Sequence, residues 1–236
     1  MLKKSLPALL NEIRQKLELM ESRLPKRVDA MAVSRISKVP YKVLFYREAL
    51  IWRMAELGRG ALEDFEREKL ASAMVVTRAA VETSAALWYL CAKVSGAIES
   101  DSLEDIDYLM RMVVGVATDP PPLPGGAAFP RPIRIKSFLK QVEKDIPGFG
   151  CQYGMLSEYA HPNWAGTVLL YAKHDSGKRV TDFGPNIRKG EATSGIGIGN
   201  LSVALAMFER SYNRVGELIP AFTALCEKSL NDKPGL

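Results

Sequence analysis

The chain has 236 residues, of which 47% are hydrophobic and 25% charged, and its formal net charge is +5. This is the composition of an ordinary globular protein, with enough residues for a full hydrophobic core in one large domain or two small ones. The first residues lack the long apolar core of a secretory signal, and the odd number of widely spaced cysteines argues against a disulfide framework. We therefore expect a cytoplasmic protein with free, buried thiols at Cys91, Cys151 and Cys226.

Positive charge is concentrated near the start of the chain. Residues 1–60 carry 13 lysines and arginines against 6 acidic residues, a net charge of +7, whereas the rest of the chain carries −2. A basic region of this kind could meet phosphate or an acidic partner. The simpler explanation is the solvated surface of packed helices, because the basic residues are not interleaved with aromatic residues that look exposed.

Residues 5–24 have the pattern of an amphipathic helix with a heptad seam, within an N-terminal segment 1–25 that ends at Pro25. The seam residues step by 4, 3, 4, 3 and 4 positions: Leu6, Leu10, Ile13, Leu17, Met20 and Leu24. The seam either packs on the body of the protein or pairs with a second copy. Packing is slightly favoured, and a homodimer is expected.

Two further helices are predicted in the next stretch. One covers about 41–57 and stops at Gly58-Arg59-Gly60, and a longer one covers about 62–94. The longer helix could cross a bilayer by length, but Arg78 and Glu82 near its middle would each cost about 2.5–3.5 kcal/mol there. A central helix surrounded by others explains it better, and no membrane contact is expected.

Arg78 and Glu82 are one helical turn apart and can form an ion pair. Burying such a pair costs several kcal/mol per ion unless further hydrogen bonds complete it. The pair therefore either links helices as a structural element or lines a polar pocket, since charges on an otherwise apolar helix often mark a functional site.

Residues 102–116 form another predicted helix, which begins at a capping-box-like Ser102-Leu103-Glu104-Asp105. Residues 119–132 contain six prolines and two glycines and are predicted to be a long loop. A helix over 133–146 follows. Because neither side of the loop looks complete alone, we expect a single helical domain over 1–236.

The most informative stretch runs from Tyr153 to Trp164. Helical spacing places Tyr153, Leu156, Ser157, Ala160 and His161 on one face, and Pro162 should end the helix at His161. Ser157 lies one turn before His161, within reach of a side-chain contact. Imidazole titrates near neutral pH, so His161 is either a general acid–base group or a capping residue that fills core space.

After Pro162 the spacing of the hydrophobic residues changes from that of a helix to that of β-strands, and the last part of the chain is again predicted to be helical. Residues 167–183 predict a small β-hairpin, with strands over 167–172 and 179–183. The glycine-rich residues 193–200 predict a flexible lead-in to a last helix over 201–230, kinked or interrupted at Pro220. That helix carries a polar cluster, including Arg210, that we expect to face the same centre as Arg78.

A metal or other cofactor is not expected. The chain has two histidines, His161 and His174, and no pair of closely spaced cysteine and histidine ligands beyond Cys151 and His161. Ser157 lacks the surroundings of a hydrolase nucleophile. The sequence thus predicts a mainly α-helical bundle of six to seven helices with one small β-hairpin.

The motif Tyr153-x-x-Leu156-Ser157-x-x-x-His161-Pro162, preceded by Arg78-x-x-x-Glu82 on a long helix, resembles a family of largely uncharacterised bacterial helical proteins. These are often placed near the HEPN (higher eukaryotes and prokaryotes nucleotide-binding) group. The resemblance covers roughly residues 40–225. It implies a dimerising helical bundle, and in some members RNA-cleaving or antiviral activity that uses an Arg four to six residues before a His. Residues 151–157 contain no Arg, so Arg78 or Arg210 would have to supply that charge through space.

Two hypotheses follow. In the first, the protein is RNA-directed, as a ribonuclease or RNA-binding protein of the toxin or defence type, with His161, Arg78 and Glu82 as catalytic residues. Tyr153, Ser157, Asn163 and Arg210 would then be binding residues. In the second, the protein is a non-catalytic interaction or scaffold protein. An Arg78–Glu82–His161 network would then fix the helix packing while the N-terminal seam binds a partner.

Overall fold

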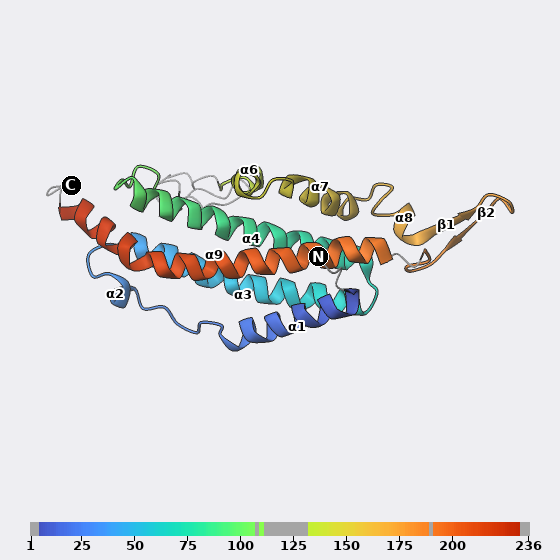
Figure 1. The fold of residues 1–236 in the computed structure, drawn as a ribbon, viewed down its shortest axis with the longest axis horizontal. Coiled ribbons are helices and arrows are strands. Elements are labelled where there is room, and N and C mark those ends of the chain that lie inside the picture. The colour runs from blue at the N-terminus through green and yellow to red at the C-terminus, as the bar shows by residue number, and fades with distance from the viewer. Residues whose placement is uncertain (1–4, 107–108, 111–131, 189–190, 232–236) are drawn as a thin grey trace, which may run out of the picture.

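The computed structural model describes residues 5–106, 109–110, 132–188 and 191–231. The described residues form eight helices and one two-stranded antiparallel hairpin (Figure 1), which confirms the predicted mainly α fold with a small β-hairpin. The elements are α1 (Leu6–Ser22), α2 (Ala30–Val33), α3 (Val39–Glu66), α4 (Leu70–Glu99), α6 (Ile135–Asp145), α7 (Phe149–Ala160), α8 (Val168–Tyr171), β1 (Ala172–Asp175), β2 (Val180–Phe183) and α9 (Glu191–Asn231).

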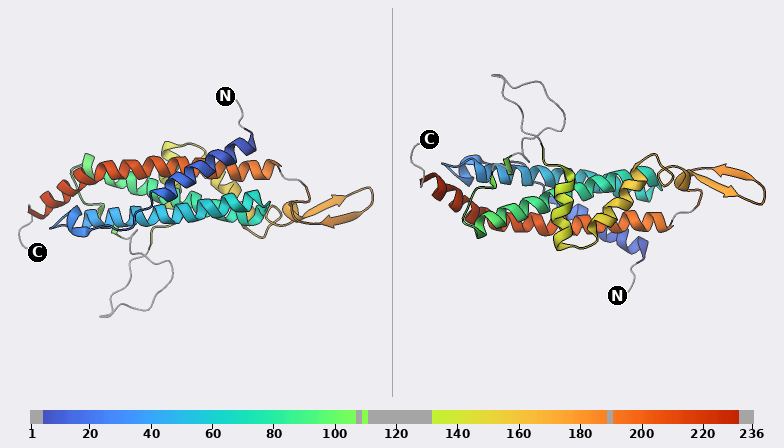
Figure 2. Two further views of the ribbon diagram at one scale, coloured as in Figure 1. Left: turned by 90° about the horizontal axis from the view of Figure 1, so that it is seen from below. Right: turned by 90° about the horizontal axis from the view of Figure 1, so that it is seen from above.

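Three long helices form the body of the bundle. α3 runs in the opposite direction to α4 and α9, and the three lie side by side along the long axis (Figures 1 and 2). α1 covers the side formed by α3 and α9, whereas α6 and α7 cover the opposite side of α4, with α6 lying across the long helices. α4 is therefore the central helix, as its apolar sequence predicts.

The N-terminal seam packs on the body of the protein. Ile13 and Leu17 are fully buried where α1 contacts α3 and α9. A Cβ added at Gly58 would lie 2.6 Å from Leu17 Cδ2, so the absence of a side chain at Gly58 makes room for α1. The predicted helix end at Gly58-Arg59-Gly60 is wrong for this reason: the glycine accommodates a neighbouring helix, and α3 continues to Glu66.

The break between α3 and α4 lies at residues 67–69, and the predicted start of the long helix near Leu62 is also wrong. Glu68 has a φ of 56°, in the left-handed region, and the N–H of Lys69 donates to the Asp64 carbonyl at 2.8 Å. These interactions close α3. Residues 62–66, predicted to begin the long helix, therefore form the last turn of α3, and α4 begins at Leu70.

α9 begins earlier than predicted. Its glycine-rich beginning is helical from Glu191, so the prediction of a flexible lead-in before Leu201 is wrong. A Cβ at Gly197 would lie 2.6 Å from Met74 Sδ and closer still to the Phe65 ring, so this glycine lets α9 approach α3 and α4. Pro220 lies inside α9, which continues through it to Asn231.

The hairpin projects beyond the end of the bundle at which α4 and α9 begin (Figure 1). β1 and β2 pair from Ala172–Phe183 to Asp175–Val180. The predicted first strand over 167–172 is wrong in position: residues 168–171 form the single-turn helix α8, and the strand follows it.

The predicted Pro-rich loop 119–132 lies outside the described residues except for Pro132, as does most of the predicted helix 102–116.

Among the described residues, one helix, α4, has the length and the apolar composition that could span a bilayer. In its most apolar window 61% of the residues are buried inside the bundle, which explains the apolar sequence by core packing.

All three cysteines are free. Cys226 is buried and Cys91 partly so, but Cys151 is exposed on α7, so the expectation of buried thiols is wrong there.

Candidate functional site

The candidate site depends on how α7 is held against α4. Pro147 follows the end of α6, and Gly148 adopts a left-handed φ of 88° that turns the chain into α7. The carboxylate of Glu143 accepts hydrogen bonds from the N–H groups of Gly150 at 2.6 Å and Gly148 at 2.7 Å. These two bonds lower the pKa of Glu143 and satisfy free donors at the beginning of α7.

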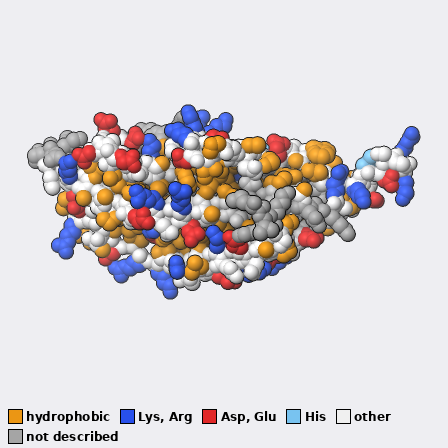
Figure 3. All heavy atoms as spheres, in the orientation of Figure 1, with side chains coloured by type: hydrophobic (Ala, Val, Ile, Leu, Met, Phe, Trp, Pro, Cys, Tyr) orange, Lys and Arg blue, Asp and Glu red, His pale blue; other side chains and the backbone are white. Residues whose placement is uncertain are grey.

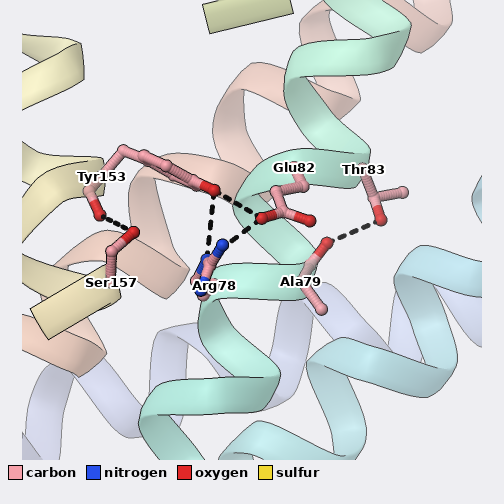
Figure 4. Close-up of polar contacts among 6 residues, drawn as sticks. All are labelled: Arg78, Ala79, Glu82, Thr83, Tyr153 and Ser157. Carbon is pink, nitrogen blue, oxygen red and sulfur yellow. Dashed lines mark hydrogen bonds and ion pairs between the residues drawn. The ribbon is translucent and has the colours of Figure 1, made fainter. Parts of the chain in front are cut away.

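Arg78, Glu82 and Tyr153 meet between α4 and α7 (Figure 4). The Tyr153 hydroxyl donates to Glu82 Oε1 at 2.7 Å, and Arg78 Nε lies 3.1 Å from both that carboxylate oxygen and the Tyr153 hydroxyl oxygen. The Arg78 guanidinium carbon also lies 5.3 Å from the centre of the Tyr153 ring. The two charged residues of α4 are thus joined to α7 through one tyrosine.

The cluster lies at the surface of the bundle and is not sealed in the core. The side chains of Arg78 and Glu82 are 28% and 32% exposed, so water reaches both ions and the pair is weaker than a fully buried one. Burial raises the pKa of Tyr153, and its hydrogen bond to Glu82 raises that pKa further. The phenol therefore keeps the proton that it donates to the carboxylate.

His161 lies outside this cluster. It is the residue at which α7 ends, as predicted from Pro162: its N–H donates to the Ser157 carbonyl at 3.1 Å, and its backbone is extended. The exposed imidazole makes no hydrogen bond or ion pair to any described residue. It lines an open groove with the beginning of α4, including Ala71 and Val75, rather than reaching Arg78 or Glu82.

Ser157 and Asn163, two of the other predicted binding residues, form hydrogen bonds near the end of α7 and not with His161. Ser157 Oγ donates to the Tyr153 carbonyl one turn back, at 3.1 Å, and forms no hydrogen bond with the imidazole of His161. Asn163 donates to Glu158 Oε2 at 2.5 Å and accepts from the N–H of Gly166, which stabilises the turn after α7.

Arg210 lies on α9 with its guanidinium carbon 5.8 Å from the centre of the Trp88 ring. The two residues line a cleft with Asp145, Ser211 and Arg214, whereas Arg78 is not among its residues. The expectation that Arg210 faces the same centre as Arg78 is therefore wrong. α9 presents this arginine to a different part of α4, about ten residues further along that helix.

A second polar cluster, between α3 and α9, was missed by the sequence analysis. The Tyr212 hydroxyl donates to Glu48 Oε2 at 2.6 Å, and Arg47, which pairs with Glu48, donates from Nε to the Tyr212 carbonyl at 2.9 Å. Burial and then the hydrogen bond to Glu48 raise the pKa of Tyr212. The sequence gives no comparable signal, because α3 carries other charged residues along its length, such as Arg53, Glu56 and Arg59, and Arg47 and Glu48 do not stand out among them.

No group of three or more metal-ligating side chains occurs in the part of the chain that the structure describes. Comparison with family models, with curated proteins and with solved structures found no match to this chain. The resemblance to HEPN-like proteins therefore stays a prediction.

Proposed function

We propose that this protein acts by binding, as a cytoplasmic, dimeric interaction protein in which the Arg78–Glu82–Tyr153 cluster holds α7 on α4. The observation that supports this is the separation of His161 from that cluster. Tyr153 lies eight residues before His161, the residue at which α7 ends, and at 1.5 Å per helical residue this corresponds to about 12 Å along the axis of α7.

This separation matters because RNA cleavage by an imidazole and a guanidinium requires both groups at the same phosphate. Here Arg78 Nε lies 3.1 Å from both Glu82 and Tyr153, so the guanidinium is oriented within the protein. Withdrawing it from these partners would cost its ion pair with Glu82 and its hydrogen bond to Tyr153, one of the two bonds by which this cluster joins α7 to α4. The arrangement favours a structural role for the three residues.

The second candidate function is RNA cleavage with His161 as the proton-transfer group. One observation favours it: the imidazole is exposed beside an open groove and has no hydrogen-bond partner among the described residues, so it is free to transfer a proton. Arg78 and Glu82 would then act only after rearrangement.

An assay with end-labelled RNA and purified protein separates the two functions. The variants are His161→Ala and, as a matched control, His174→Ala, the other histidine of the chain, which lies on the hairpin and bonds to Thr181. The binding function predicts intact RNA with all three proteins and nearly equal melting temperatures, since both imidazoles are exposed. Cleavage by the wild type and His174→Ala, but not by His161→Ala, would establish the ribonuclease instead.

A further inference from the structure

We propose that residues 23–42, together with the exposed face of the first half of α3, form a binding surface for a single-stranded nucleic acid. This basic surface lies around α2, at the end of the bundle opposite the hairpin (Figure 1). The inference rests on the interaction function proposed above and gives that function a location and a class of partner.

Residues 23–42 carry positive charge that no neighbouring carboxylate neutralises. Residues 23–42 contain one carboxylate, Asp29, and six cations: Arg23, Lys26, Arg27, Arg35, Lys38 and Lys42. Asp29 accepts a hydrogen bond from the Met31 N–H at 3.0 Å and so caps α2. None of the six cations forms a side-chain hydrogen bond or ion pair with a described residue, and five of them are exposed. Lysine and arginine side chains are prominent at this lower left edge in Figure 3.

Other cations of residues 1–60 contrast with these six because carboxylates neutralise them. Arg14 pairs with Glu66, Arg59 with Glu21 and Lys16 with Glu209. Arg47 pairs with Glu48. The excess positive charge of the N-terminal quarter is therefore concentrated in residues 23–42. A polyanion placed there would release its condensed counterions, which favours binding.

The fold also brings exposed aromatic side chains to this surface. Trp52 is 49% exposed, and its indole N–H donates to the Pro25 carbonyl at 2.8 Å. Phe45 is 46% exposed and stacks on Tyr41 at 6.2 Å between ring centres. Lys38, Lys42, Phe45 and Trp52 follow helical spacing on one exposed side of α3. Cations that follow the backbone and aromatic rings that stack on bases are the combination that binds single strands.

A cleft of about 430 Å³ lies next to these residues. Arg27, Val28 and Leu44 lie among the residues that line it, and the Arg47–Glu48–Tyr212 cluster forms a polar part of its wall. Arg47 and Glu48 already hold partners in each other and in Tyr212, so this cluster keeps the wall of the cleft in place. An open cleft beside cations and exposed rings can take the bases of a strand, whereas a lipid surface would lie flat across it, which is why the cleft favours a nucleic acid strand.

Fluorescence anisotropy tests the proposal, with labelled 20-nucleotide oligouridine and oligothymidine titrated at 50 and 200 mM salt. The test variant is Arg27→Ala/Arg35→Ala/Lys38→Ala. The matched control, Lys173→Ala/Lys178→Ala/Arg179→Ala, removes the same charge from the hairpin. We expect the test variant to lose at least tenfold in affinity and about 2 from the slope of log K against log salt, and the control to lose less than threefold.

A second variant, Phe45→Ala, tests stacking: it should weaken binding severalfold and leave the salt slope unchanged. Melting temperatures within about 2 °C of the wild type verify that the variants fold. Equal losses in test and control triple variants, tighter binding to a duplex than to a single strand, or binding only to phosphatidylcholine–phosphatidylserine (3:1) vesicles would overturn the proposal.

The outcomes for the surface and for the proposed function are separable. Oligothymidine has no 2′-hydroxyl to act as a nucleophile, so its binding reports on the surface alone, even if the protein proves to cleave RNA. Conversely, an absence of strand binding together with intact RNA would reject this surface and leave the interaction function standing.

Discussion

The Tyr153 hydroxyl and the Glu82 carboxylate, 71 residues apart in the sequence, are joined by a hydrogen bond of 2.7 Å. The same hydroxyl lies 3.1 Å from Arg78 Nε, so one phenol links both ions of α4 to α7. Only two residues of α7, Phe149 and Leu156, are otherwise buried against the bundle. The polar cluster is thus a substantial part of what attaches α7.

Replacing Tyr153 with Phe should lower the free energy of unfolding by about 1 kcal/mol. The hydrogen bond to an ion would contribute more if fully buried, but Arg78 and Glu82 are partly exposed, which reduces its contribution. For a chain of this length that corresponds to a decrease in melting temperature of about 2–4 °C, measurable by circular dichroism. An unchanged melting temperature would show that the cluster does not stabilise the fold.

The stability of the protein should decrease in alkali, beginning near pH 10. Burial raises the pKa values of Tyr46, Tyr153 and Tyr212, with smaller contributions from neighbouring groups. Above the ordinary tyrosine pKa of about 10 the unfolded chain loses these protons while the folded protein keeps them, so unfolding becomes more favourable as pH rises. Urea denaturation at pH 8, 9.5 and 10.5 measures the effect. Tyr153→Phe should make the pH dependence shallower, and a stability that rises over this range would contradict the assignment.

Two glycines of α9 should respond oppositely to the same substitution. Gly197→Ala would place a methyl group 2.6 Å from Met74 Sδ and should destabilise the protein by about 1–3 kcal/mol. Gly199→Ala meets nothing within 4 Å, and the higher helix propensity of Ala should stabilise by up to about 1 kcal/mol. Thermal denaturation of the pair tests whether α9 is helical this early, because a flexible segment would tolerate both changes alike.

The three cysteines should differ in reactivity. Burial and the Glu227 carboxylate raise the pKa of Cys226 to about 11, and burial also raises the pKa of Cys91. Because the thiolate is the reactive form, iodoacetamide at pH 7.5 should alkylate exposed Cys151 first and Cys226 only on unfolding. Mass spectrometry of samples taken at successive times measures the order in which the three cysteines are alkylated. Early modification of Cys226 would mean that α9 does not pack as described.

Local sequence signals predicted much of the fold. The heptad seam of α1 and the end of α7 before Pro162 are set by side-chain spacing and by proline geometry, which a sequence displays directly. The end of α3 was misplaced because Gly58 and Gly60 look like a helix stop. The actual stop, at Glu68, depends on a left-handed residue of a type that gives no such signal. Gly58 and Gly197 serve contacts with other helices, and those contacts are invisible in a local window.

The candidate site was predicted only in part, for a related reason. Arg78 and Glu82 lie one turn apart on α4, as helical spacing predicts. The shared face predicted for Tyr153 and His161 does not give them the same neighbours, because eight residues separate them and His161 follows the end of α7 with an extended backbone. Tyr153 reaches the ions, whereas His161 reaches the first turns of α4. The position of Trp52 was also not predictable from a local window, because the fold brings its indole to Pro25, 27 positions earlier in the chain, among the basic residues.

A double-mutant cycle tests the central claim, that the Arg78–Glu82–Tyr153 cluster stabilises the attachment of α7 to α4. The measurement is the free energy of unfolding in urea of the wild type, Glu82→Ala, Tyr153→Phe and the double variant. A direct stabilising contact predicts a coupling energy of at least about 0.5 kcal/mol, with the double variant less destabilised than the sum of the single variants. Additive effects, with a coupling energy near zero, would show that the two residues do not stabilise the fold together and would contradict this account.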